Sequence, residues 1–227
     1  MSKVLFWDFD GTLVHPNESF RDSLCATFSS AGKYLPPEHA RAFLQTACSW
    51  YHPEEVYPHR TGSAWWDTLF AKCHPFYAAQ GFAPPQYASL DAEFRTRICS
   101  PEHYTLYEDA LSTLEACSSL GYTHYLLSNN FPELTGILRA FGLEAYFAGV
   151  ILSSQVGYEK PHPALFRHAL QLAGHPTHCY MIGDNPVADV QGANSVGMPA
   201  FLVHRSTSFP ADFHCASLAD IPAHLSL

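Results

Sequence analysis

Short apolar segments recur along the chain and are typical of strands that are buried on both faces. Residues 3–9 (KVLFWDF) form an apolar run that ends at the turn dipeptide Asp10-Gly11. Four similar runs follow far downstream, at residues 123–128, 149–152, 178–182 and 199–203. Runs of this kind, without a regular alternation of polar and apolar positions, indicate the parallel sheet of an α/β protein.

Segments with helical spacing separate the later apolar runs. They cover residues 108–120, 132–141, 163–173 and 186–196. Pro163 and Pro186 stand where a first helical turn tolerates a missing N–H, and a glycine follows each of the four segments. Because strands and helices that alternate at this spacing form right-handed βαβ units, the expected fold is a doubly wound, parallel, five-stranded α/β sheet.

The stretch from residue 15 to residue 104 has a different pattern, without a convincing strand. Proline-rich breaks divide it into helix-like segments at residues 18–31, 37–50, 63–80 and 85–99. This pattern predicts an all-helical insertion after the first strand. We therefore expect a core domain made of residues 1–14 and 105–227, and an inserted helical domain of residues 15–104.

Composition narrows the possible partners. The 12 Lys and Arg residues against 21 Asp and Glu residues give a formal charge of −9, which argues against a nucleic-acid-binding surface. The seven cysteines are scattered and include no C-x-x-C pair, so neither a disulfide framework nor a zinc site is predicted. No apolar stretch approaches the roughly 20 residues that span a bilayer, and the N-terminal run is too short for a signal peptide. We expect a cytoplasmic protein with no membrane partner.

Polar residues gather where the predicted strands end. They are Asp8, Asp10, Ser128, Asn129, Asn130, Asp184, Asn185 and Asp189. The carboxyl ends of parallel strands share one edge of a sheet, where ligands bind. Neighbouring carboxylates disfavour one another, and Mg²⁺ relieves that repulsion. Lys160, after the third strand, adds a positive charge that suits either a phosphoryl oxygen or a neighbouring carboxylate. Each residue alone is a common turn former, helix cap or surface residue, but their shared placement favours a binding site.

At these positions the sequence resembles the haloacid dehalogenase-like hydrolase superfamily, over essentially its whole length. Its D-x-D-G-T motif matches residues 8–12, and its apolar strand ending in Ser or Thr matches residues 126–129. Its Lys-Pro motif matches residues 160–161, and its G-D-x-x-x-x-D motif matches residues 183–189. The resemblance implies a Rossmann-like core, and the helical insertion is similar to the cap domain of the helical-cap phosphatases.

The resemblance also implies a reaction and a metal ion. Asp8 would be the nucleophile that forms an aspartyl-phosphate. Asp10 would be the general acid that protonates the leaving group and then the base that activates water. Mg²⁺ would be held by Asp8, by Asp184 and by the backbone carbonyl of Asp10.

The other matched residues are implied to bind phosphate or to support the site. Lys160 would take part in catalysis and, together with Ser128 and Asn129, would bind the oxygens of the transferred group. Three residues would have supporting roles: Gly11, Thr12 and Asp189.

The expected function is that of a magnesium-dependent phosphatase acting on a small phosphorylated metabolite. Asp10 favours phosphate-ester chemistry, because dehalogenase relatives lack this second aspartate and phosphonate-cleaving relatives replace it. Two alternatives stay open: a phosphomutase that returns the phosphoryl group to a sugar, and a binding or regulatory protein without useful turnover. We expect a monomer or a weak homodimer.

Three residues of the insertion are candidates for substrate contact: His15, Arg60 and Trp65. His15 begins the insertion next to the first motif, and Arg60 precedes the helical segment that contains Trp65. The alternative is structural, with the tryptophan packed in the insertion's own core and the arginine in solvent. We favour the structural interpretation, because aromatic residues at helical spacing usually bury apolar area.

Overall fold

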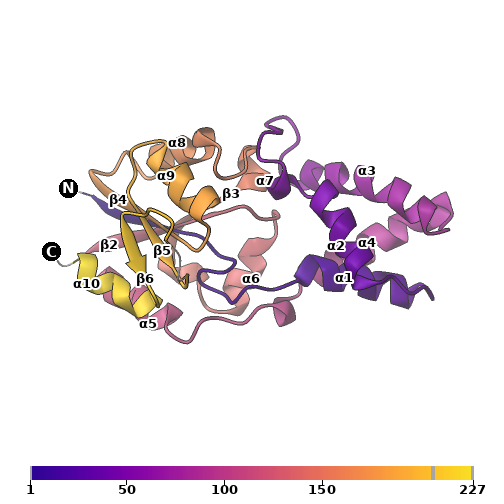
Figure 1. Ribbon diagram of the computed structural model, residues 1–227, viewed down its shortest axis with the longest axis horizontal. Helices are drawn as coiled ribbons and strands as arrows, with labels where there is room; N and C mark the ends of the chain where they lie inside the picture. Colours follow the sequence, from indigo (N-terminus) through magenta and orange to yellow (C-terminus); the bar gives the residue numbers. More distant parts are fainter. Residues whose placement is uncertain (1, 206–207, 226–227) are drawn as a thin grey trace.

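The computed structural model describes residues 2–205 and 208–225, which contain a six-stranded parallel sheet (Figure 1). The strands are β1 (Lys3–Trp7), β2 (Tyr122–Ser128), β3 (Phe147–Leu152), β4 (His178–Gly183), β5 (Ala200–Val203) and β6 (Phe213–Cys215). Their spatial order is β3-β2-β1-β4-β5-β6. The winding therefore reverses at β1, and ligands of such sheets bind beside the strand ends at this point. The predicted doubly wound α/β fold is confirmed.

The expected number of five strands is wrong, because β6 adds a sixth at the edge of the sheet. It pairs with β5 in parallel, with Phe201 opposite Phe213 and Val203 opposite Cys215. A strand of three residues is too short to show a hydrophobic period, so only its partner strand defines it.

Helices cover both faces of the sheet. They are α5 (Ala110–Ser119), α6 (Leu134–Ala140), α7 (Ser153–Val156), α8 (Pro163–Leu172), α9 (Gly192–Asn194) and α10 (Ile221–Leu225). Leu5 and Trp7 of β1 share one buried cluster with residues of α5, α6 and α10. Val4 and Phe6 share a second cluster with residues of α8 and α9. Successive residues of β1 thus point to opposite faces, and both faces are buried, which explains the continuous apolar run.

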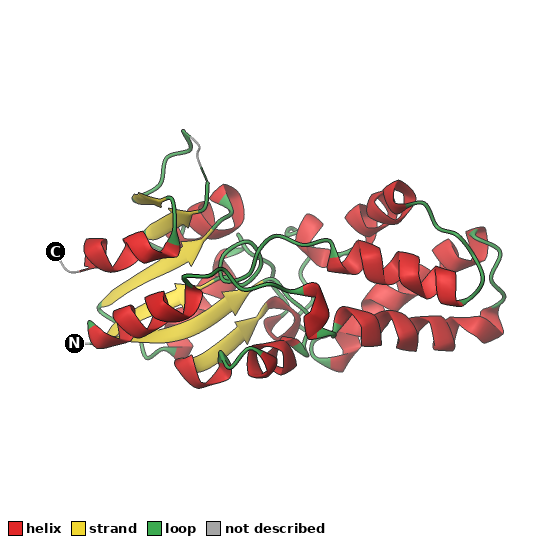
Figure 2. Cartoon of the chain, turned by 90° about the horizontal axis from the view of Figure 1, so that it is seen from below, coloured by secondary structure: helices red, strands yellow, loops and turns green. Residues whose placement is uncertain are grey.

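Four helices form a block at the end of the molecule opposite the chain termini (Figure 1). They are α1 (Ser19–Ser30), α2 (Pro37–Ala47), α3 (Ser63–Ala79) and α4 (Tyr87–Ile98), and together they are called the helical block below. Figure 2 shows helices and loops but no strand in this part of the described chain. The predicted helix at residues 37–50 ends at Ala47, and a separate 3₁₀ turn, η1 (Ser49–Tyr51), follows it.

The connections contain several short helical turns. They are η2 (Pro84–Gln86), η3 (Pro101–His103), η4 (Glu144–Tyr146), η5 (Pro186–Gln191) and η6 (Leu218–Asp220). The helix expected at residues 186–196 is instead a π-helical turn, η5, continued by α9. Within the described ranges of the chain, no helix has the length and apolar character needed to cross a membrane.

Candidate active site

The turn after β1 is shaped by one carbonyl group and one glycine. The Phe9 carbonyl oxygen accepts hydrogen bonds from the backbone N–H groups of Thr12, Leu13 and Val14, at 3.2, 2.9 and 3.1 Å. Gly11 has φ +75°, and a Cβ added there would lie 2.6 Å from the carboxylate carbon of Asp184. Only glycine fits this conformation and this space. The turn thereby brings the end of β1 against the end of β4.

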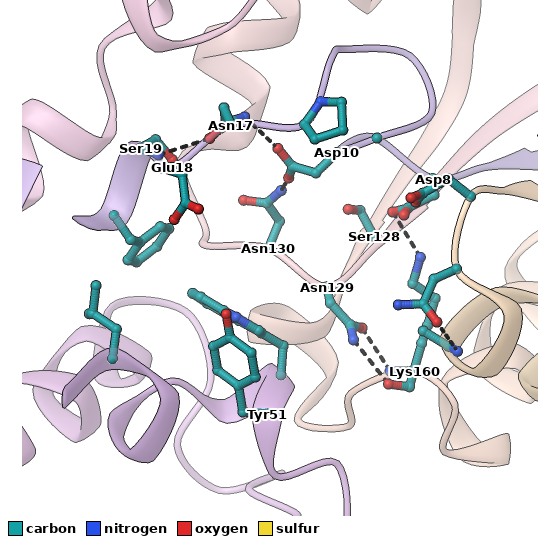
Figure 3. Close-up of a pocket in the computed structure, with 18 of the residues that line it drawn as sticks. Asp8, Asp10, Asn17, Glu18, Ser19, Tyr51, Ser128, Asn129, Asn130 and Lys160 are labelled. Carbon is teal, nitrogen blue, oxygen red and sulfur yellow. Dashed lines mark hydrogen bonds and ion pairs between the residues drawn. The ribbon is translucent and has the colours of Figure 1, made fainter. Parts of the chain in front are cut away.

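A cavity of about 430 Å³ lies between this edge of the sheet and the helical block (Figure 3). One wall carries polar residues from the strand ends: Asp8, Asp10, Ser128, Asn129, Asn130, Lys160 and Asp184. The facing wall mixes charged and apolar side chains: Glu18, Phe20, Arg21, Arg41, Leu44, Trp50 and Tyr51. The cavity is large enough for a phosphate group together with a small organic group attached to it.

Lys160 is the buried cation of the site. Its Nζ lies 2.8 Å from Oδ1 of Asp8 and 2.6 Å from Oδ1 of Asp189. Burial alone would lower the pKa of the ammonium group, but the two carboxylates outweigh burial and raise it. Burial raises the pKa of Asp189, and the Lys160 ammonium opposes that rise. Lys160 is therefore a permanently charged group beside Asp8.

The Asn129 side chain fixes the backbone of Lys160. Its Nδ2 donates to the Lys160 carbonyl oxygen at 3.0 Å, and its Oδ1 accepts from the Lys160 N–H at 2.7 Å. Both functional atoms of the amide are thus engaged with the lysine backbone, and Figure 3 shows the pair beside Ser128. The expected contact of Asn129 with phosphate stays a prediction. The geometry assigns it, in addition, the positioning of Lys160.

Asp10 lies between two amide side chains. Asn17 Nδ2 donates to its Oδ1 at 3.0 Å, and Asn130 Nδ2 donates to its Oδ2 at 2.7 Å. Burial and the nearby charge of Asp8 raise the pKa of Asp10 to about 7, although the two amides oppose the rise. The carboxyl group of Asp10 is therefore oriented by both oxygens and titrates near neutrality, which suits proton transfer.

Three buried carboxylates could hold a cation. Asp8, Asp184 and Asp189 each offer an oxygen, and these oxygens lie within 4.8 Å of one another. Burial and the charge of Asp8 raise the pKa of Asp184. The Arg205 guanidinium opposes this rise, with its Nη2 2.6 Å from Oδ2 of Asp184. Carboxylate oxygens are the donors that Mg²⁺ prefers, so the residues present fit this ion. Asp10 contributes no side-chain oxygen to this cluster, and the expectation that its backbone carbonyl binds metal stays a prediction.

The remaining predicted residues divide between the site and its surroundings. Ser128 is buried and lies next to Asp8 (Figure 3). Thr12 is buried, and its carbonyl oxygen is 3.1 Å from Nε2 of His204. Thr12 is part of the turn after β1 but does not line the cavity.

The three candidates from the insertion lie outside the cavity wall. The His15 ring lies against the Tyr107 ring, with centroids 3.8 Å apart and planes tilted by 33°. Arg60 is exposed, and Trp65 is buried against Trp50. Arg60 and Trp65 border a separate cavity of only about 50 Å³. Their proposed contact with substrate has no support from this arrangement.

Several residues of the site were not predicted from the sequence. Asn130 and Asn17 orient Asp10, and Arg205 faces Asp184. Asn130 stands among the polar residues at the predicted strand ends, but the sequence alone indicates no role for it. Asn17 follows no strand-end pattern, and only the folded chain brings it to the site. Arg205 stands two residues after β5, so its position was a usable signal.

Comparison with known proteins identifies the family to which this chain belongs. The haloacid dehalogenase-like hydrolase model matches residues 2–197. Haloacid dehalogenase-like hydrolase domain-containing protein 3 of Danio rerio is 26% identical over 97% of this chain and 95% of its own. Phosphoserine phosphatase of Thermus thermophilus is 39% identical over 55% of this chain and 50% of its own length.

A solved structure with a similar fold is that of a haloacid dehalogenase-like (HAD) hydrolase from Bacillus subtilis bound to magnesium. It has a TM-score of 0.74 and 16% identity, and the alignment covers 100% of this chain and 99% of the other. The resemblance inferred from the four motifs is confirmed by the family model, which spans most of the chain. The protein is an enzyme that belongs to the haloacid dehalogenase-like hydrolase family.

Proposed function

We propose that this protein is a magnesium-dependent phosphatase that hydrolyses a small phosphorylated metabolite through a phosphorylated Asp8. The observation that carries the proposal is the placement of Asp8 beside a buried ammonium group, with Nζ of Lys160 2.8 Å from Oδ1. Asp10, two residues on, is held by two amides in the same cavity. Phosphoserine phosphatase is among the relatives, which supports phosphate-ester chemistry.

The two aspartates divide the reaction into two displacements. The Asp8 carboxylate attacks phosphorus, and the bond from phosphorus to the leaving oxygen breaks as Asp10 gives that oxygen its proton. Asp10 then takes a proton from water, and the resulting hydroxide displaces phosphate from Asp8. Because the pKa of Asp10 is raised to about 7, its carboxyl group can act as acid and as base near neutral pH.

Lys160 and Ser128 bind the transferred group. The ammonium group is charged and fixed by Asp8 and Asp189, so it needs no rearrangement when negative charge develops on the phosphoryl oxygens. The Asn129 amide holds the Lys160 backbone through two hydrogen bonds and thereby positions the lysine side chain at the cavity.

Magnesium would be held by the side chains of Asp8 and Asp184 and by the backbone carbonyl of Asp10. When bound, it supplies positive charge that lets an anionic carboxylate approach an anionic phosphate. The magnesium named for the similar Bacillus subtilis hydrolase supports this choice of ion. Gly11 keeps the Asp184 carboxylate close to the turn, since no Cβ stands between them.

A cytoplasmic location is consistent with the state of the cysteines. All seven are free thiols, as expected in a reducing compartment.

The decisive experiment measures phosphate release from p-nitrophenyl phosphate and a panel of phosphorylated metabolites in MgCl₂. We expect turnover by the wild-type protein and a loss of at least about a thousandfold in Asp8→Asn, because the amide cannot act as the nucleophile. Asp67→Asn, on the exposed surface of α3, is the matched control and should retain full activity.

Three results would contradict the proposal. One is a wild-type protein that releases no phosphate from any ester. Another is an Asp8→Asn protein that stays active. The third is a product mixture that contains an isomerised sugar phosphate but no free phosphate, which would identify a phosphomutase.

A further inference from the structure

A buried carboxylate that the proposed mechanism does not use stands directly before the catalytic lysine. Glu159 has no exposed surface, and it does not line the substrate cavity. An ionisable side chain is rarely buried in this way unless it is hydrogen-bonded. Its partners therefore indicate what it does.

Two hydroxyl groups from the segment between α2 and α3 donate to Glu159, and Ser153, directly after β3, is a further hydrogen-bond partner. Ser49 Oγ donates to Oε1 of Glu159 at 2.5 Å, and the Tyr57 hydroxyl donates to the same oxygen. The two donors are 110 and 102 residues away from Glu159 in sequence. We call Ser49, Tyr57 and Glu159 the Glu159 junction.

The junction lies in a close backbone contact. The Tyr57 N–H donates to the Gly157 carbonyl at 2.9 Å, and the Gly62 N–H donates to the Ser154 carbonyl at 2.9 Å. A Cβ at Gly157 would lie 2.4 Å from the Pro58 backbone, so the two segments approach as closely as glycine permits. The junction therefore joins two segments whose separation is already tightly defined.

Ser49 belongs to the short turn η1, whose next two residues face the substrate. Trp50 and Tyr51 line the cavity opposite the strand ends, and Figure 3 shows the Tyr51 ring directed into it. Trp65 Nε1 lies 3.3 Å from Ser49 Oγ, and the Trp65 and Trp50 rings stack at 6.3 Å. One turn thus carries both a donor to Glu159 and the aromatic wall.

We propose that the Glu159 junction is a specificity-determining device that fixes the distance between the aromatic wall, Trp50 and Tyr51, and the phosphoryl-binding Lys160. It rests on the proposed function for the identity of the phosphoryl site. Glu159 is a positioning residue, because it acts through η1 on one side and through its chain neighbour on the other. Lys160 itself stays in place without the junction, because Asn129, Asp8 and Asp189 hold it independently.

This division of tasks predicts a dependence on ligand size. A ligand with only a small group on phosphorus contacts the lysine end of the cavity, so weakening the junction leaves its affinity unchanged. A ligand with an aromatic group also contacts Trp50 and Tyr51, and it loses affinity when that wall shifts. Such selectivity is not expected if the junction merely stabilises the fold.

The test compares binding of phenylphosphonate and methylphosphonate in MgCl₂ by titration calorimetry, with wild-type protein, Tyr57→Phe and Ser49→Ala. Each substitution removes one hydroxyl donor to Glu159. We expect the Kd of phenylphosphonate to rise by about 5- to 30-fold and that of methylphosphonate to change less than about twofold. Because both donors share one acceptor oxygen, the double variant should show a non-additive effect on the phenylphosphonate Kd.

Matched variants separate the junction from general effects on folding. Tyr87→Phe removes a hydroxyl from α4, where the ring packs on His74 away from the cavity, and should leave both Kd values unchanged. Glu159→Gln keeps an acceptor oxygen and should retain most of the selectivity, whereas Glu159→Leu should lose it.

Equal weakening of both phosphonates in Tyr57→Phe and Ser49→Ala would overturn the inference, and so would unchanged binding of both. Wild-type protein that does not prefer the aromatic phosphonate would also overturn it. The proposed function is tested separately by phosphate release. If no ester is hydrolysed but the junction variants lose phosphonate selectivity, the phosphatase proposal fails and the positioning role stands.

Discussion

The hydrogen bonds of the buried His124 determine which of its two ring nitrogens carries the proton. The indole N–H of Trp7 donates to its Nδ1 at 2.9 Å, so Nδ1 carries no proton. Nε2 lies 3.1 Å from the Leu114 carbonyl oxygen and therefore holds the proton that it donates there. Burial lowers the pKa of His124 to about 4, although the hydrogen bond to the Leu114 carbonyl opposes this shift. Of the 14 histidines, this one is part of the core and not a metal ligand.

The lowered pKa predicts that His124 couples folding to pH. The unfolded chain takes up a proton on this ring below about pH 6.5, while the folded protein resists protonation until about pH 4. The stabilisation is therefore complete above pH 6.5 and is lost as the pH falls toward 4, by up to about 3 kcal/mol. We expect the difference in unfolding free energy between wild type and His124→Asn, measured in urea, to shrink over this interval.

His168, exposed on α8, provides the control for this measurement. His168→Asn should differ from the wild type by a small amount that does not change between pH 7 and pH 4. If the gap between wild type and His124→Asn also stayed constant, the neutral buried ring would not contribute to the pH dependence.

At the scale of elements, β6 depends on contacts rather than on its own sequence pattern. Phe213 stacks on Phe201 of β5 with centroids 4.5 Å apart, and it also meets the rings of Tyr180 and His224. Asp212, next to the strand, accepts hydrogen bonds from the Ala200 N–H and the Asn194 side chain, both at 2.9 Å. The strand is held by neighbours that are distant in sequence.

We therefore expect Phe213→Ala to lower the unfolding free energy by about 1–3 kcal/mol, since it removes a half-buried ring and the stacking contact of that ring with Phe201. Urea denaturation followed by circular dichroism measures the change. His214→Ala alters the exposed residue of the same strand and should cost less than about 0.5 kcal/mol. Equal losses in the two variants would show that the aromatic packing does not stabilise the strand.

At the scale of the whole molecule, two carboxylates join the sheet to the helical block and its connections. Glu159 accepts from Ser49 and Tyr57, and Glu133 accepts from Trp66 Nε1 at 2.8 Å and pairs with Arg95. Both carboxylates belong to loops that carry predicted phosphate-binding residues. The helical block is thus connected directly to the part of the sheet where chemistry is proposed.

The net charge of −9 leads to a prediction for the molecule as a whole. At pH 8 and about 100 mM salt, the protein should pass through a heparin column and be retained by an anion exchanger. The negatively charged protein is repelled by heparin, which is a polyanion, and attracted by the positively charged exchanger. The site cation Lys160 is buried and paired, so it does not create a basic surface. Retention on heparin would reveal a basic patch and contradict the exclusion of nucleic acid as a partner.

The sequence by itself determined the fold class and the strand-end residues of the site. Strands buried on both faces give short, continuous apolar runs, and the ends of parallel strands must share one edge of the sheet. Asp8, Asp10, Ser128 and Asp184 could therefore be grouped without coordinates. The same reasoning identified Lys160 in the loop after β3. These features depend on local pattern and on a topology with few alternatives.

Only the tertiary structure decided which residues face these groups. Asn17 and the Trp50–Tyr51 wall come from connections whose course depends on packing over long separations, and no local period encodes that course. The cavity is bordered by η1 and not by Arg60 and Trp65, because the end of α2 at Ala47 and the contact of Ser49 with Glu159 place the turn there. The chemistry follows from strand ends, whereas the shape of the substrate site follows from how the helical block meets them.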